Sequence, residues 1–136
     1  MGTEKPLGQM IIELGLDSAS FSRGMKGINQ QIKTSMTEMT AHLKVMGKSG
    51  SEIDRLKIRQ DGLTAALSAQ NAKVSLAKEK YEACRDAVEG NTQATQQQKD
   101  ALIKAQNEYV KAIGDLGQYG NELKEVTIRL DAMESG

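Results

Sequence analysis

The side chains best suited to chemistry in this sequence are one histidine and one cysteine, and both lack the neighbours that chemistry needs. His42 is the only histidine, whereas protein metal sites usually combine several His, Cys or acidic ligands. Cys84 is the only cysteine, and a thiol nucleophile needs a base or cation that lowers its pKa. We interpret His42 as an ordinary helical residue and Cys84 as a small buried apolar residue. A lone cysteine makes no internal disulfide, which favours a reducing compartment.

The charged residues and glycines also lack the spacing of a catalytic or phosphate-binding site. Acids are interleaved with bases, as in residues 78–82 (Lys-Glu-Lys-Tyr-Glu), which predicts a solvated helix face with ion pairs four residues apart. Gly24 with Gly27, and Gly114 with Gly117, have neither the lysine nor the strand–turn context of a phosphate loop. We therefore expect a protein that is not an enzyme and that uses no cofactor and no metal.

The composition argues for slender helices. Apolar residues make up 38% of the chain, aromatic residues only 3%, and tryptophan is absent, so a thick globular core is not expected. The 18 basic and 18 acidic residues cancel, which argues against general nucleic-acid affinity. No apolar run approaches the ~18 residues of a membrane-spanning helix, and the N-terminus does not resemble a signal peptide. We expect a soluble segment with no specific nucleic acid and no membrane as partner.

Residues 1–16 form the first expected unit, an N-terminal segment with one short strand. Apolar residues alternate with others over residues 9–15, which is the period of a strand. No second strand signal follows. A lone strand leaves backbone groups unpaired, so we expect this one to pair with a strand outside the chain.

Residues 17–47 form the second expected unit, a methionine-rich helix of roughly 28 residues. Capping residues precede it, and its apolar positions are three and four residues apart. Methionine is common on surfaces that adapt to partners, so the stripe is either an ordinary apolar face or a contact between copies. The candidate self-association residues are Met10, Ile12, Leu14, Phe21, Met25, Ile28, Ile32, Met36 and Met39.

Residues 51–134 form the third expected unit, a long antiparallel helical hairpin resembling a coiled coil. Two heptad seams are separated by a turn near residues 90–95, where Gly90 and Asn91 suit a helix end and Thr92 or Thr95 a new cap. The seam residues are Leu56, Leu63, Leu67, Val74, Ala77, Tyr81, Cys84, Leu102, Ala105, Tyr109, Leu116, Tyr119, Leu123, Val126 and Leu130.

One continuous helix in a parallel bundle is the rival to this hairpin, because the heptad phase runs through the turn unbroken. The antiparallel arrangement places Tyr109 against Ala77 and Tyr81 against Ala105. Large side chains then meet small ones, as dense packing requires. Gly114, Gly117 and Gly120 lie three apart in the second seam, and we interpret them as a flexible stretch rather than a site of close backbone approach. The fold class expected overall is mainly all-α.

The order of these features resembles the start of the tail tape measure proteins of long-tailed phages and prophages. The resemblance rests on the apolar segment 6–17 ending in Leu-Asp, on Phe21 shortly after it, and on the Met/Ile helix. It continues in two long helices divided at a turn that contains Gly90 and Thr95. It covers nearly the whole chain.

The resemblance implies a virion structural protein of phage tail assembly that sets tail length. Its implied partners are other copies of itself, the tail tube protein and tail assembly chaperones. Its implied location is the host cytoplasm during assembly and the tail lumen in the mature virion. At ~1.5 Å per helical residue the chain spans only ~200 Å, and family members are several times longer, so we expect an N-terminal fragment of such a protein.

A second hypothesis from another class is a helical-hairpin binding module, such as a small secreted effector or a chaperone. Small secreted hairpins of the WxG type carry a Trp-x-Gly turn, and this chain has no tryptophan. A prefoldin-like chaperone places a multistranded β-region at the hairpin base, whereas a single strand is expected here. The phage hypothesis is therefore preferred.

Overall fold

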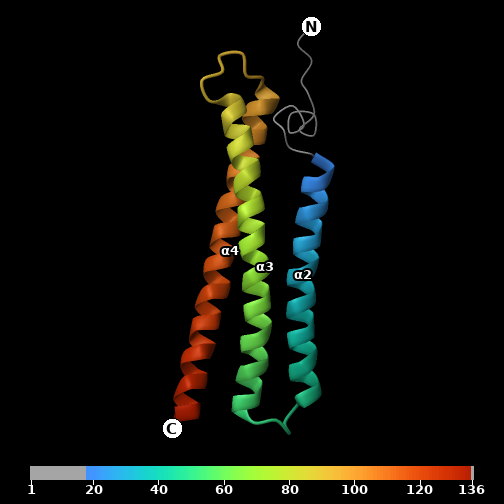
Figure 1. Ribbon diagram of the computed structural model, residues 1–136, viewed down its shortest axis with the longest axis vertical. Coiled ribbons are helices and arrows are strands. Elements are labelled where there is room, and N and C mark those ends of the chain that lie inside the picture. Colours follow the sequence, from blue (N-terminus) through green and yellow to red (C-terminus); the bar gives the residue numbers. More distant parts are fainter. Residues whose placement is uncertain (1–17, 136) are drawn as a thin grey trace.

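The computed structural model describes residues 18–135, which form three long helices. They are α2 (Ser18–Met46), α3 (Glu52–Val88) and α4 (Gln96–Ser135). Helix α3 lies between the other two and runs antiparallel to both, so that the C-terminus and the α2–α3 connection lie at the same end (Figure 1). The all-α class and the helical hairpin predicted from the sequence are confirmed. The strand expected at residues 9–15 lies outside the described residues, and residues 18–135 contain no strand.

The α2–α3 connection is fixed by local hydrogen bonds. Gly47 adopts a positive φ of 54° while its N–H donates to the Leu43 carbonyl at 3.1 Å, a helix end that suits glycine. Ser51 caps α3, because its Oγ accepts a hydrogen bond from the Asp54 N–H at 3.1 Å. The Arg55 side chain donates to the Gly47 carbonyl and so ties the new helix to the connection.

The α3–α4 turn explains why the unbroken heptad phase does not give one continuous helix. Gly90, with φ 72°, follows the last turn of α3. Thr95 then caps α4: its Oγ1 accepts from the Gln98 N–H at 3.0 Å, and the Gln98 side chain accepts from the Thr95 N–H at 2.9 Å. This reciprocal pair is a capping box. Of the two threonines proposed from the sequence, Thr95 is the cap.

An aliphatic core occupies the half of the bundle near the α2–α3 connection. Its buried residues are Leu56, Leu63, Val126 and Leu130. Half-buried side chains from all three helices pack against them, namely Met36, Met39, Ile53, Tyr119 and Leu123. Burial of such side chains contributes roughly 1.5–3 kcal/mol each before chain entropy is subtracted. This core therefore joins α2 to the hairpin.

Gly62 permits the close approach of α2 to α3 in this core. A Cβ placed there would lie 2.7 Å from the Met39 Cβ and 2.8 Å from its sulfur. Real Cβ atoms do not come so close to other heavy atoms. The sequence offers no reason for a glycine inside this helix, and the packing of Met39 supplies it.

A small-residue core occupies the other half of the bundle, near the α3–α4 turn. It consists of Cys84, Ala101 and Ala105, with Tyr81 and Leu102 packed against it. The predicted contact of Tyr81 with the region of Ala105 is observed. The Tyr81 and Tyr109 rings also stack on each other, with centroids 5.7 Å apart and an interplanar angle of 25°. Size matching alone did not predict this stack, because it assigned each ring only to an alanine on the facing helix.

Candidate functional site

A groove lies between α2 and α4 in the half of the bundle that contains the small-residue core. Its volume is about 700 Å³, and Ala77 of α3 and Ala112 of α4, both buried, form part of its lining. Phe21 and Met25 line it from α2. Alanine leaves space that leucine would fill. The half of the bundle with alanines therefore has a groove, whereas larger side chains fill the aliphatic half.

Five lysines line this groove, which we call the lysine groove. They are Lys26, Lys33, Lys73, Lys80 and Lys111, accompanied by the acids Glu108 and Asp115. The excess of positive charge beside an apolar wall suits a partner that carries carboxylates or phosphates next to an apolar surface.

Lys80 is the side chain that joins the three helices at the groove. Its side chain is 11% exposed, and its Nζ donates to Glu108 Oε2 at 3.1 Å. The same Nζ lies 5.4 Å from the centroid of the Phe21 ring, within the range of a cation–π contact. One cation thus contacts a carboxylate of α4 and an aromatic ring of α2.

Sequence reasoning missed Lys80, because a lysine inside a charged run is normally solvated. A signal was present all the same. Lys80 lies three residues after Ala77 and four before Cys84, which is itself heptad spacing. The missed buried alanines Ala66, Ala69 and Ala101 show that the buried face is wider than the predicted seam.

The two polar positions that weaken the α3 seam face α4 with hydrogen-bonding partners. Gln70 is 2% exposed, and its Nε2 donates to the Ala112 carbonyl at 2.9 Å. Gln60 Nε2 lies 3.4 Å from Thr127 Oγ1, which is a long contact. A buried amide with a partner avoids the cost of lost hydration, so Gln70 is compatible with the core and fixes the register of the hairpin locally.

Cys84 is 1% exposed within the small-residue core. Burial raises the pKa of its thiol; nearby Lys80 acts in the opposite direction and Glu108 in the same direction. A raised pKa keeps the sulfur protonated and therefore a poor nucleophile near neutral pH. His42 is exposed on α2, and within residues 18–135 no group of three or more His, Cys, Asp and Glu side chains is placed to hold a metal ion.

The predicted self-association residues divide between the two halves of the bundle. Met10, Ile12 and Leu14 lie outside the described residues. Phe21 and Met25 line the lysine groove, Met36 and Met39 pack in the aliphatic core, and Ile28 and Ile32 between them are half-buried. The stripe thus has a partner within the chain along at least part of its length, and contact between copies stays a prediction.

Every residue of the predicted hairpin seam is buried or half-buried in the bundle. The buried members are Leu56, Leu63, Ala77, Cys84, Ala105, Val126 and Leu130. The half-buried members are Leu67, Val74, Tyr81, Leu102, Tyr109, Leu116, Tyr119 and Leu123. None of these side chains is fully exposed, as an interface between two helices requires.

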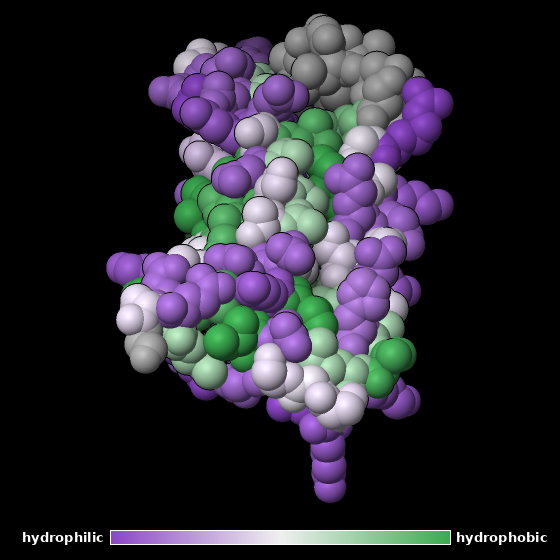
Figure 2. Space-filling model, turned by 60° about the horizontal axis from the view of Figure 1, so that its bottom comes forward, coloured by the Kyte–Doolittle hydropathy of each residue, from purple (hydrophilic) through white to green (hydrophobic). Residues whose placement is uncertain are grey.

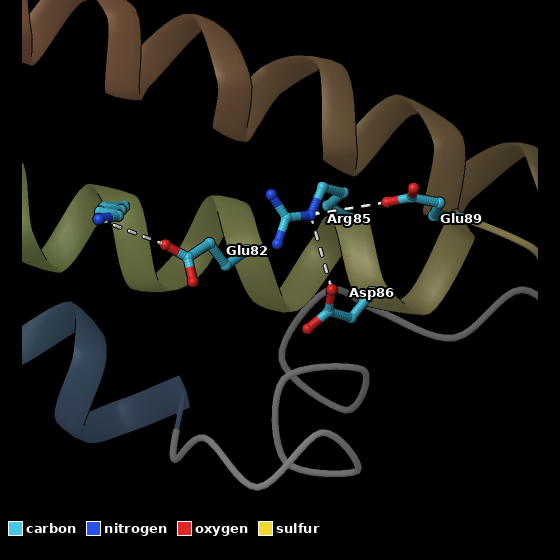
Figure 3. A network of polar contacts seen from close by, with 5 residues as sticks. Glu82, Arg85, Asp86 and Glu89 are labelled. Atoms are coloured by element: carbon cyan, nitrogen blue, oxygen red, sulfur yellow. Dashed lines mark ion pairs between the residues drawn. The ribbon is translucent and has the colours of Figure 1, made fainter.

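The outward face of α3 near the turn carries ordinary surface ion pairs. Arg85 Nε lies 3.6 Å from Asp86 and 3.7 Å from Glu89, and Lys78 lies 3.8 Å from Glu82 (Figure 3). All these side chains are at least 42% exposed. Such pairs contribute only ~0.2–0.5 kcal/mol each. The exposed pair of Lys78 with Glu82 agrees with the solvated face predicted from residues 78–82, whereas the prediction is wrong for Lys80, which is buried.

The surface alternates between apolar and hydrophilic areas. Figure 2 shows apolar side chains gathered mainly toward the middle of one face, with hydrophilic side chains along its margins. None of the helices in the described part of the chain has the length and apolar character that crossing a membrane requires.

Comparisons of the chain with protein-family models, with curated proteins and with solved structures found no match.

Proposed function

We propose that this chain is the N-terminal part of a phage tail tape measure protein, a structural protein that sets tail length from within the tail lumen. The observation that carries the proposal is the order of features along the sequence. An apolar segment ending in Leu-Asp precedes Phe21 and a Met/Ile helix, and two long heptad helices follow, divided at Gly90 and Thr95. This order resembles the start of tape measure proteins.

The slender architecture supports the same proposal. Helix α4 alone has 40 residues and is therefore ~60 Å long, while the buried side chains form two thin cores. A protein that measures length needs extent along one axis and repeated contact with its surroundings. In the proposed role the partners are other copies, the tail tube protein and tail assembly chaperones, with assembly in the host cytoplasm.

The proposal is tested by changing the length of the chain inside its gene. Duplicating in frame the 40 residues of α4 adds ~60 Å of helix, and electron microscopy of negatively stained tails measures the result. We expect tails longer by about that amount, to the nearest ring of tube protein. Deleting the same segment shortens the tails by a similar amount.

Two controls make the outcome specific. A gene with synonymous codons over the α4 segment leaves the protein unchanged, and its tails keep their length. Antibodies against the chain, applied to disrupted tails on a blot, detect it in the purified particles. Tails of unchanged length after both the duplication and the deletion contradict a measuring role, as does a chain missing from purified tails.

A second candidate function is a helical-hairpin binding module, such as a small secreted effector or a chaperone. The observation that favours it is the lysine groove, which presents five cations beside Phe21 and Met25. The two proposals differ in where the protein is found. A binding module of this kind accumulates free in the cytoplasm or the culture medium, whereas a tape measure sediments with the tails.

A further inference from the structure

Helix α4 carries large aliphatic side chains on the face that points away from the bundle. Ile103, Val110 and Ile128 are 56%, 60% and 58% exposed. Each lies two residues from a buried residue of the same helix, which places it about 200° around the helix axis from the core. Scattered exposed aliphatics are normal, but these share one stripe and are unusual for that reason.

The middle of this stripe is formed by glycines that the bundle itself does not need. A Cβ added at Gly114 or Gly117 meets no atom within 4 Å, in contrast to Gly62. Each glycine costs about 1 kcal/mol of helix stability relative to alanine. The packing of the described residues gives no reason for this cost, and the missing side chains leave room here for another backbone to approach closely.

The charges beside the stripe change sign along α4. Lys99, Lys104 and Lys111 lie in its first half, whereas Glu122, Glu125 and Asp131 lie in its second half. Among residues 18–135, none of these six side chains takes part in an ion pair. A helix with unpaired cations toward one end and unpaired anions toward the other is complementary to itself when a second copy runs in the opposite direction.

We propose that the outer face of α4 pairs with the same face of a second copy, antiparallel, about a two-fold axis between Gly114 and Gly117. The occupant of this face is a second copy of this chain because one register satisfies both the aliphatic side chains and the charges. In that register Ile103 of each copy packs on Ile128 of the other, and the glycines lie at the crossing point. A two-fold interface repeats every contact.

The same register brings opposite charges together along the flanks. With the axis between Gly114 and Gly117, the numbers of facing residues sum to 231, so Lys104 faces a position two residues from Glu125 of the second copy, and Lys111 faces a position two residues from Glu122. An offset of two residues is ~3 Å along the helix, which these long side chains span. These four residues share one flank of α4, because the steps from Lys104 to Lys111, to Glu122 and to Glu125 are seven, eleven and three residues, which are helical repeats. Antiparallel helices related by a two-fold axis bring the same flank of each copy together. On the other flank Lys99 lies opposite Asp131.

The remaining charges of α4 are compatible with this register. Arg129 is already paired with Glu52 at 3.2 Å, and Asp100, which accepts a hydrogen bond from Gln96 at 2.9 Å, lies near Arg129 of the second copy. Lys124 lies opposite the neutral Gln106. The inference concerns the chain free in solution and does not rest on the proposed function.

A charge exchange tests the pairing directly. Sedimentation equilibrium of the full chain, over about a hundredfold range of concentration, is expected to show reversible dimerisation. Lys104→Glu alone, or Glu125→Lys alone, weakens dimerisation by roughly tenfold, because each change creates two repulsive contacts in a two-fold interface. The double variant K104E/E125K restores it, since both contacts are opposite-charge pairs again.

A cysteine pair tests the register independently. In a Cys84→Ala background, Ile103→Cys together with Ile128→Cys is expected to give a covalent dimer under mild oxidation, linked 103 to 128. The two positions are ~37 Å apart along one helix, so such a link joins two chains. A monomer at every concentration, failure of the double charge variant to dimerise, or a 103–103 link overturns the proposal.

A matched substitution separates this face from general surface apolarity. Ile128→Glu is expected to weaken dimerisation at least tenfold, because each of the two copies then carries a charge in the apolar stripe. Val45→Glu is the control, since Val45 is 87% exposed at the end of α2 and lies outside the stripe. Equal effects of the two changes contradict the assignment of the dimer contact to α4.

Discussion

The two halves of the bundle share the same heptad repeat and differ in the size of the side chains that fill it. Near the α2–α3 connection Leu56, Leu63 and Leu130 close the space between α3 and α4, and methionines of α2 complete the core. Near the α3–α4 turn Ala101, Ala105 and Cys84 fill the same kind of position. The heptad repeat decides which residues face inward. The volume of those side chains decides whether the three helices pack tightly together or leave a groove between them.

The halves also differ in how α2 is held. In the aliphatic core Met39 packs on Gly62 through direct van der Waals contact. Beside the small-residue core a single cation, Lys80, lies between Phe21 and Glu108. In the aliphatic core, apolar contact closes the interface between α2 and the hairpin. Beside the small-residue core, the contacts of Lys80 with Phe21 and Glu108, which we call the charged bridge, cross an open groove. The predictions below separate the two modes of attachment.

The largest expected effect is the loss of a leucine from the aliphatic core. Leu63→Ala leaves a cavity at a position that is 1% exposed, and such changes cost roughly 2–5 kcal/mol. Cys84→Ala removes one sulfur from the other core and costs about 1 kcal/mol. Urea unfolding followed by circular dichroism measures both. Equal losses of unfolding free energy would show that the two cores contribute alike to stability.

The second effect concerns Gly62. Gly62→Ala forces a Cβ into the Met39 side chain, and overpacking of this kind costs roughly 1–3 kcal/mol, more than alanine gains as a helix former. Gly27→Ala is the control, because a Cβ there meets nothing within 4 Å; it is expected to stabilise by about 1 kcal/mol. The sign of the change in unfolding free energy therefore differs between two glycine-to-alanine substitutions. Stabilisation by both would mean that α2 does not pack closely on α3 at this point.

The third effect concerns the charged bridge. Lys80→Met removes the partner of Glu108 and the cation beside Phe21, with an expected loss of about 1–2 kcal/mol, since hydrogen bonds to charged groups contribute in that range. Lys78→Met removes only an exposed pair with Glu82 and is expected to change stability by less than about 0.5 kcal/mol. A double-mutant cycle of Lys80→Met with Glu108→Gln isolates the coupling between the two side chains. A coupling no larger than that of an exposed pair would contradict a structural role for the bridge.

Periodicity and capping residues were enough to predict most of this fold. The long helices, the turn at Gly90 and a cap at either Thr92 or Thr95 follow from local rules, because helices form from nearby contacts. The heptad spacing of Lys80 indicates its burial, but its contact with α2, like the role of Gly62, was not predictable in this way. Both depend on α2, which packs on the outside of the hairpin, and the heptad pattern of α3 contains no information about a third helix. The lysine groove was missed for the same reason, since its lysines come from three different helices.

The smallest effect is a pH dependence that belongs to the small-residue core alone. Burial raises the pKa of the Cys84 thiol, so the folded chain keeps this proton at pH values where the unfolded chain has lost it. Folding stability therefore falls as pH rises from the usual thiol pKa of about 8.5 through the raised value, and it is unaffected by this group at lower pH. Cys84→Ala retains every other titratable group of the chain. The stability advantage of the wild-type chain over Cys84→Ala is thus expected to shrink as pH rises above the usual thiol pKa of about 8.5, measured as the difference between the two urea unfolding free energies at each pH. An advantage that stays constant or grows over this range would indicate that the thiol ionises as readily in the fold as in the unfolded chain, and that the small-residue core is wetter than its packing implies.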